Sequence, residues 1–340
     1  MIYYIALLSY VMLLRLLTSM HPNKKTGDRL FAFLSCVGVV LFQGFRDFSV
    51  GNDLVHYIPY FKEMGELPAG CLHIANFEPG YVLINKILYK AGFGERGLII
   101  FIAALIQIPI FYTIYKFSDD MLMSILWYFS FGEFIFTFSG LRQAIAMSIC
   151  FAGFYFIKEK KFWPFFFTCL VAATFHKSAL ISLVVYPAYH IKISNKWLIT
   201  MVCACLFVFT FSEELLGFVT KYFYSSYGEV ENTGAYTMVI AYFGLYVLSF
   251  WNKEPDDDYM GMRNILLILV LIYCFAPVSD VFTRVSFVME LYMCLFIPKI
   301  IASFNFRPKL IYYGCCYMLL SVCMFRFIGM FHTLPFRFAV

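Results

Sequence analysis

The segment LFAFLSCVGVVLFQGFRDFSVGNDLVHY, residues 30–57, decides the fold. Residues 30–42 are almost wholly apolar, whereas residues 44–57 bring together two aspartates, an arginine, a histidine and two glycines. An apolar run that passes into a charged segment is typical of a helix that leaves a membrane at its surface. The question that this segment raises is whether residues 44–57 are a solvated loop or the edge of an active site.

The composition of the whole chain answers the first part of that question. Of the 340 residues, 62% are hydrophobic and only 14% are charged, whereas a soluble globular protein has about 25% charged residues. The apolar runs are long and continuous, which excludes the short alternating strands of a membrane β-barrel. The sequence therefore predicts an all-α polytopic membrane protein.

Several functional classes are excluded by motifs that the sequence lacks. It contains no P-loop, no dinucleotide-binding fingerprint and no HExxH motif, and its eleven cysteines form no paired CxxC motifs. The net charge of +5 is spread over many loops, unlike the concentrated basic patch of a nucleic-acid-binding protein. We therefore expect no cofactor, no metal and no nucleic-acid partner.

About twelve apolar segments are candidates for spanning helices, each of which needs about 20 mostly apolar residues. The first has no basic region and no small-residue cleavage site, so we interpret it as a retained helix and not a signal peptide. No internal repeat divides the chain, which predicts one domain over residues 1–340. The predicted spans are roughly 2–19, 30–45, 97–116, 121–138, 141–157, 162–175, 177–191, 196–212, 235–251, 264–279, 284–303 and 309–326.

The distribution of Lys and Arg predicts the orientation, because cytoplasmic loops of membrane proteins are enriched in both. Both termini then face the periplasm of a bacterial inner membrane, together with two longer segments at about 46–96 and 212–234. Within the first of these, GYVLINKILYKAG (80–92) is too short to span and predicts a helix that lies in the interface. The loops assigned to the cytoplasm are 21–29, 158–161, 190–196, 252–263 and 305–309.

This topology brings strongly polar residues from seven places in the sequence to the periplasmic face. The orientation was set from the opposite loops, so their convergence is an independent indication of a functional site. These residues are Arg46, Asp47, Asp53, His56, Glu78, Arg142, Gln143, His176, Lys177, Asp280, Arg284 and Arg326.

The arginines have two interpretations. Arg142 and Arg284 each begin a predicted helix, where an arginine can simply extend to the lipid head groups. A helix N-terminus already carries partial positive charge, however, so a cation there is favourable when an anion binds. With Arg46 on the same face, two such arginines predict a phosphate-binding site. Arg326, near the end of the last predicted helix, has the same two interpretations.

The candidate acids and bases also have structural alternatives. Asp53 and Glu78 are carboxylates that could take a proton from a substrate, but each also stands where a residue caps a helix N-terminus. His176 lies in a tight turn between apolar runs. It is either a structural histidine bonded to a carbonyl or a group that moves a proton, since an unperturbed imidazole titrates near pH 6.5.

Three motifs in this order resemble the EpsG-type polysaccharide polymerases, Wzy-like proteins of bacterial exopolysaccharide, capsule and O-antigen synthesis. The similarity extends over about residues 40–300, and FHKSAL and TRVSFVMELY agree with it more weakly. The C-terminal LPFRF is similar to the family's usual ending, with Phe336 at the position where a tyrosine is expected. The motifs are R-x4-G-x-D-x3-Y (Arg46, Gly51, Asp53, Tyr57), E-x-G-Y (Glu78, Gly80, Tyr81) and LRQ followed by small residues (Arg142, Gln143, Ala146).

The resemblance implies a reaction and a set of site residues. A polymerase of this kind transfers a growing glycan from undecaprenyl diphosphate to the non-reducing end of a lipid-linked repeat unit, at the periplasmic face. It also implies a GT-C-like architecture, the lipid bilayer as environment and a chain-length regulator as a further candidate partner. The implied roles are diphosphate binding for Arg46, Arg142, Arg284 and Arg326, catalysis for Asp53, Glu78 and His176, and other substrate contacts for Tyr57, Tyr81 and Gln143.

Three other functions are compatible with a membrane protein of this composition. A transporter or flippase for lipid-linked oligosaccharide would carry charges deep in several helices and reach both faces, whereas most charges here gather on one face. An O-antigen ligase would use the same donor with a different acceptor. A membrane acyltransferase would need a cytoplasmic histidine motif, and none stands out in the sequence.

Overall fold

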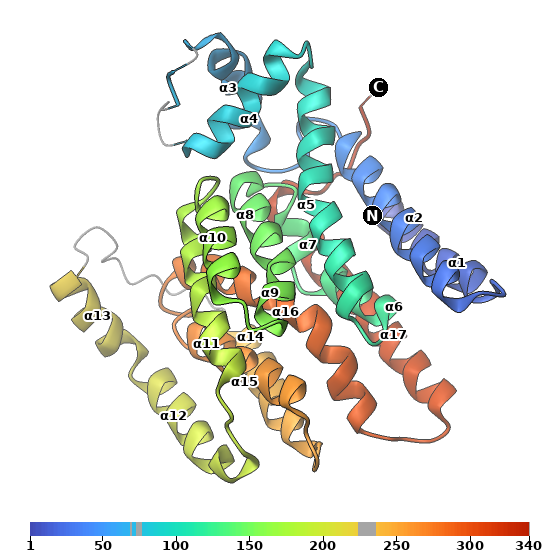
Figure 1. Cartoon of the computed structure of the whole chain (residues 1–340), viewed down its shortest axis with the longest axis vertical. Helices are drawn as coiled ribbons and strands as arrows, with labels where there is room; N and C mark the ends of the chain where they lie inside the picture. The colour runs from blue at the N-terminus through green and yellow to red at the C-terminus, as the bar shows by residue number, and fades with distance from the viewer. Residues whose placement is uncertain (69, 73–76, 224–235, 340) are drawn as a thin grey trace. The chain divides into compact units, whose positions relative to one another are not determined.

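The computed structural model describes residues 1–68, 70–72, 77–223 and 236–339, which are very largely helical (Figure 1). Among them are five helices long and apolar enough to cross a membrane. The chain is therefore a polytopic helical membrane protein, as predicted. The five helices are α1 (Ile2–Ser19), α2 (Lys24–Gly44), α5 (Glu95–Phe117), α16 (Asp280–Ser303) and α17 (Lys309–Phe327).

Several of the other predicted spans are divided in the structure. The helical segments over Lys177–His190 and Asn195–Thr210 together have the composition of a span but are bent by 116°. The span predicted at 121–138 consists of α6 (Met121–Ser130) and the one-turn helix α7 (Glu133–Phe136). That at 141–157 consists of α8 (Leu141–Ala152) and α9 (Phe154–Lys158). The number twelve stays a prediction.

Polar caps explain why some helices begin earlier than their apolar windows. The Asn23 side chain accepts a hydrogen bond from the Thr26 backbone, and α2 begins at Lys24 instead of the predicted residue 30. Asp256 caps α15 (Asp257–Tyr273) in the same way through the backbone of Tyr259. Such caps satisfy amide groups that the first helical turn leaves unpaired, so they fix a helix start independently of hydropathy.

The helices form two compact units, Met1–Leu180 with Arg307–Val340, and Ile181–Phe306. In the first, α2 packs on α1 and α5, α8 packs on α5 and α10, and α17 packs on α6; in the second, α15 packs on α11, α14 and α16. The expectation of one domain over 1–340 stays a prediction. Five further helices of these units are α10 (Phe162–Ala173), α11 (Val185–His190), α12 (Leu198–Thr210), α13 (Ser212–Phe223) and α14 (Tyr236–Leu248).

Two further helices belong to the first predicted periplasmic segment, and they pack on each other. These are α3 (Leu54–Glu66) and α4 (Pro79–Lys90). The helix expected at 80–92 is thus confirmed as α4, and its place in the membrane interface stays a prediction. In the second predicted segment, 212–234, the structure begins with α13, and residues 224–234 lie outside the described residues.

A buried polar network joins α2, α5 and α6 inside the first unit. Gln107 Nε2 donates to Gln43 Oε1 at 2.9 Å and to the Tyr128 hydroxyl at 2.9 Å, and Gln43 Nε2 donates to Thr137 Oγ1 at 2.6 Å. All four side chains are buried. Because an unpaired amide in such a place would cost about 1–3 kcal/mol, the network fixes how these helices pack.

The C-terminal segment lies along residues 45–52 and holds them. The Asp47 amide donates to the Arg337 carbonyl at 2.8 Å, and the Ala339 amide donates to the Phe45 carbonyl at 2.9 Å. The Phe336 ring stacks on Phe42 with 4.3 Å between centroids. This apolar contact and the backbone bonds make residues 45–52 an ordered part of the first unit, although the sequence alone would allow a loop.

Gly51 lies against the backbone of Phe138 in a conformation that favours glycine. Its φ is +108°, and a Cβ there would lie 2.3 Å from the Phe138 carbonyl oxygen. We expect Gly51→Ala to lower the thermal unfolding temperature in detergent, since a left-handed conformation costs about 1–2 kcal/mol for an L-residue and the contact adds to this.

Gly92→Ala is the matched control, because Gly92 has a φ of +81° with no atom within 4 Å of the added Cβ. It should cost only the conformational term. Equal losses for the two variants would mean that the contact with Phe138 contributes nothing.

Candidate functional site

Arg142 is the centre of a cluster in the first unit. It lies in the first turn of α8, and its side chain is about one-fifth exposed. Nη1 forms an ion pair with Glu78 Oε2, and Nε donates to the Tyr57 hydroxyl at 3.4 Å. The Arg142 Cζ also lies 4.9 Å from the centre of the Phe77 ring. The first turn of α8 is thus joined to α3 and to the residues just before α4.

Glu78 connects Arg142 with His176. One carboxylate oxygen pairs with Arg142, and the other lies 3.2 Å from His176 Nδ1. Burial tends to raise the pKa of Glu78, but the contacts with His176 and Arg142 outweigh it and hold that pKa below its ordinary value. Glu78 is therefore ionised at neutral pH, and the three side chains form a cation–carboxylate–imidazole series.

The position of Gly80 explains how Glu78 reaches His176. The Gly80 amide donates to the Thr174 carbonyl at 2.8 Å, two residues before His176. A Cβ on residue 80 would lie 2.3 Å from Thr174 Oγ1, so only glycine permits this approach. The glycine of the E-x-G-Y motif therefore attaches the start of α4 to the end of α10.

Aromatic rings surround the cluster on the side of α3 and α4. Phe77 stacks on Tyr81, with 5.7 Å between centroids and 17° between planes, and lies 5.0 Å from Tyr60. Tyr57 lies 5.4 Å from Tyr81, and both rings are buried, whereas Phe77 and Tyr60 are partly exposed. Phe77 and Tyr60 were not among the residues predicted from the sequence; the one available signal for Phe77 was its place directly before Glu78.

Asp53 lies at the N-cap position of α3, but its side chain makes no capping hydrogen bond. Its backbone amide donates to Ser139 Oγ at 3.2 Å, which joins the start of α3 to the residues before α8. The Asp53 side chain is partly exposed. The position is therefore that of a cap, and the carboxylate is not used for capping.

Arg46 is in a different environment from Arg142. Only 1% of its surface is exposed. Its three nitrogens donate to the backbone carbonyls of Val50 at 3.1 Å, Gln43 at 3.0 Å and Phe138 at 2.9 Å. Burial lowers the pKa of Arg46 to about 9, so the side chain is still charged at neutral pH. Arg46 is therefore a structural residue, which holds the backbone segments at residues 43, 50 and 138 together.

The remaining predicted residues are distributed elsewhere. Gln143 follows Arg142 and is buried. Arg326 is exposed in the last turn of α17, with its Cζ 5.8 Å from the Phe327 ring. Arg284 is exposed in the first turns of α16 and belongs to the second unit. Over the part of the chain that the structure describes, no three His, Cys, Asp or Glu residues are grouped as metal ligands.

The arrangement has two chemical capacities. A guanidinium at a helix N-terminus can bind an anion, because the backbone amides and the side chain act in the same direction. A histidine beside a carboxylate can accept a proton, since the carboxylate stabilises the imidazolium that forms. The two groups share Glu78 and therefore belong to one site.

The model of the EpsG family matches residues 29–338. The match includes each of the residues discussed above, from Arg46 to Arg326. No curated protein and no solved structure matches the chain.

Replacing Glu78 by glutamine should lower the free energy of unfolding by about 1–3 kcal/mol, since it removes a charged partner from Arg142. The loss should depend on pH. A carboxylate with a lowered pKa stabilises the fold above its unfolded value of about 4.3, and this contribution disappears as pH falls through the folded pKa. Thermal unfolding of wild type and variant should thus differ at pH 7 and converge in acid.

Glu66→Gln is the control, because Glu66 pairs with Lys62 at 3.9 Å on an exposed surface and such pairs contribute little. A Glu78→Gln protein with unchanged stability at pH 7 would contradict a structural role for the ion pair.

Proposed function

The chain belongs to the EpsG family, and from this membership and the cluster at Arg142 we propose that it polymerises a polysaccharide from lipid-linked repeat units. The donor is a growing glycan on undecaprenyl diphosphate, and the acceptor is the non-reducing end of one new lipid-linked unit. The acceptor oxygen forms a bond to the anomeric carbon, the bond from that carbon to the diphosphate breaks, and the hydroxyl proton passes to a base. The observation that carries the proposal is the contact series Arg142–Glu78–His176.

Arg142 binds the diphosphate of the donor in this proposal. Negative charge grows on the diphosphate as the glycosidic bond breaks, and a preorganised cation lowers the energy of that state. Two observations support the assignment: the side chain is partly exposed, and it lies at the N-terminus of α8, where the amides of the first turn add to its positive potential. A guanidinium also suits phosphate oxygens better than an ammonium group does.

His176 is the base in this proposal, and Glu78 is its positioning residue. The lowered pKa of Glu78 makes that carboxylate a weak proton acceptor, whereas its 3.2 Å distance from Nδ1 suits the orientation of an imidazole. Asp53 is the second candidate base, because its carboxylate takes no part in capping α3. Phe77 and Tyr60 would contact sugar rings through their partly exposed faces.

The other predicted residues take different places in the proposal. We assign Arg46 a supporting role because its donors are used by backbone carbonyls. Arg284 and Arg326 stay candidates for a second diphosphate. The reaction would occur at the periplasmic face of a bacterial inner membrane, with both termini on that side and with a chain-length regulator as a candidate partner.

Replacing Arg142 by glutamine should reduce glycan elongation by about 100-fold or more, the usual effect of removing one group that stabilises developing charge. The measurement is the ladder of products that the purified protein in liposomes makes from a lipid-linked repeat unit. Lys62→Gln, an exposed change on α3, is the control and should leave the ladder unchanged.

Full elongation by Arg142→Gln would remove this residue from the diphosphate site. If wild type makes no ladder but moves the lipid-linked substrate across the liposome membrane, the protein is a transporter. A single transfer to lipid A core would indicate an O-antigen ligase.

Replacing His176 by alanine should lower turnover by about 10²–10⁴-fold, which is the usual contribution of a general base, while donor binding is retained. Free imidazole added to His176→Ala should restore part of the activity, because it can occupy the space and accept the proton. His56→Ala, on the exposed surface of α3, is the matched control. If donor binding is lost together with turnover and imidazole restores nothing, the role of His176 is structural.

A further inference from the structure

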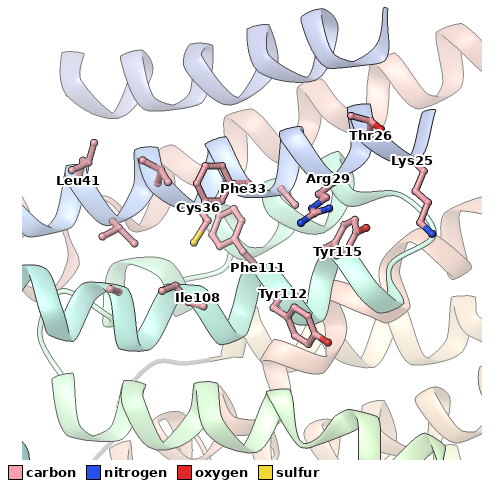
Figure 2. Close-up of a pocket in the computed structure, with 14 residues that line it drawn as sticks. Lys25, Thr26, Arg29, Phe33, Cys36, Leu41, Ile108, Phe111, Tyr112 and Tyr115 are labelled. Atoms are coloured by element: carbon pink, nitrogen blue, oxygen red, sulfur yellow. The ribbon is translucent and has the colours of Figure 1, made fainter. Parts of the chain in front are cut away.

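A groove with a volume of about 720 Å³ lies between α2 and α5 in the first unit, away from the cluster at Arg142. Its walls are mainly apolar, as Figure 2 shows for Phe33, Leu41, Ile108 and Phe111. We call it the α2–α5 groove. The two helices are antiparallel. At one end of the pair, Arg96 Nη1 of α5 donates to the Gly44 carbonyl of α2 at 2.8 Å.

The opposite end of the groove is basic. Lys25 and Arg29 project from the first turns of α2 beside Tyr115 of α5 (Figure 2). A second hollow shares Lys25 and Tyr115 with the groove and continues it toward α1. Four basic side chains and two acidic ones line this hollow, which leaves an excess of two positive charges; they are Arg15, Lys24, Lys25, Lys116, Asp28 and Asp119.

The cations at this end differ in what they already contact. Arg15 forms an ion pair with Asp28 at 2.7 Å, and Lys116 Nζ lies 4.3 Å from the centre of the Tyr155 ring. No acidic side chain pairs with Lys25 or Arg29 among the residues that the structure describes. Two exposed cations at the mouth of an apolar groove are complementary to an anionic head group with a hydrocarbon chain.

The length of the groove selects the kind of chain. Lys25 and Leu41 are sixteen residues apart on α2, a distance of about 24 Å at 1.5 Å per residue. One leaflet of a bilayer, head groups included, is about 20–22 Å deep. The groove therefore has the depth of one phospholipid molecule, with its head group at Lys25 and its chain end at Leu41.

We infer that the α2–α5 groove binds one anionic glycerophospholipid, with its phosphate at Lys25 and Arg29 and an acyl chain along Phe33 and Ile108. The site is separate from the cluster at Arg142 and does not rest on the proposed function. In the orientation proposed above it opens to the cytoplasmic leaflet, where anionic lipids and basic residues meet. The bound lipid would extend the contact between α2 and α5, the helix pair whose other end supports residues 45–52.

The test is native mass spectrometry of the full chain in detergent, titrated with phosphatidylglycerol or with phosphatidylcholine of the same acyl chains. Wild type should bind phosphatidylglycerol at least tenfold more tightly than phosphatidylcholine. The double variant Lys25→Gln/Arg29→Gln should lose at least tenfold in affinity for phosphatidylglycerol and lose the preference. The control is Arg307→Gln/Lys309→Gln, which removes two exposed charges predicted on the same side of the membrane. It should keep both the affinity for phosphatidylglycerol and the preference for it.

A second variant tests the apolar part without changing charge. Ala104 lines the groove, and Ala104→Phe should weaken the binding of both lipids by filling the space for the chain. Equal affinity of wild type for the two lipids would overturn the inference, as would equal behaviour of the two double variants. If undecaprenyl phosphate binds more tightly than phosphatidylglycerol, the groove is a polyprenyl phosphate site instead.

Discussion

The rest of the site depends on the hydrogen bonds that the buried guanidinium of Arg46 donates to backbone carbonyls. Removing a cation from water is costly unless acceptors replace the water, and here three backbone carbonyls do so. Those carbonyls belong to the end of α2, to residue 50 and to Phe138, so one side chain joins three segments. The same carbonyl of Phe138 lies against Gly51, and the hydroxyl of the adjacent Ser139 accepts a hydrogen bond from the Asp53 amide. The start of α3 and the start of α8 are thereby brought together, and Tyr57 and Arg142 meet as a consequence.

Much of the cluster could be predicted from the sequence, but the difference between its two central arginines could not. Tyr57, Glu78, Arg142 and His176 were each selected from motif and topology, and the structure brings all four together. Arg46 has the same residue type and the same predicted depth as Arg142, yet one is buried and the other partly exposed. The carbonyls that enclose Arg46 include Phe138, 92 residues away, and no local pattern reveals such a partner. Arg284 was grouped with the others by topology, by its place at the start of a predicted helix and by a weaker motif, and none of these gives distances.

Hydropathy predicted the class of the fold more reliably than the extent of its elements. The five helices that are long enough to span a membrane are long apolar runs, which hydropathy detects directly. The break between α6 and α7 changes hydropathy little, since Glu133 is the one charged residue in these two helices and the residues of both are buried. The sequence left open whether residues 44–57 are a solvated loop or the edge of a site, because the order of residues 45–52 comes from the distant C-terminal segment, through backbone bonds to Arg337 and the stacking of Phe336 on Phe42. Sequence patterns indicate the conformation that a segment prefers by itself, whereas here the C-terminal segment determines the conformation of residues 45–52.

The structure also changes the part that Glu78 can take. From the sequence it was a helix cap or a base; in the structure its side chain makes no cap hydrogen bond, and its contacts lower its pKa. A carboxylate that is stabilised as an anion accepts a proton poorly, but it is well suited to orient the cation and the imidazole on either side of it. Removing a carboxylate from this position would alter both neighbours together, because each uses a different oxygen of it. The acidic member of the E-x-G-Y motif therefore contacts both Arg142 and His176, and its glycine permits the close approach to Thr174 that brings the carboxylate near His176.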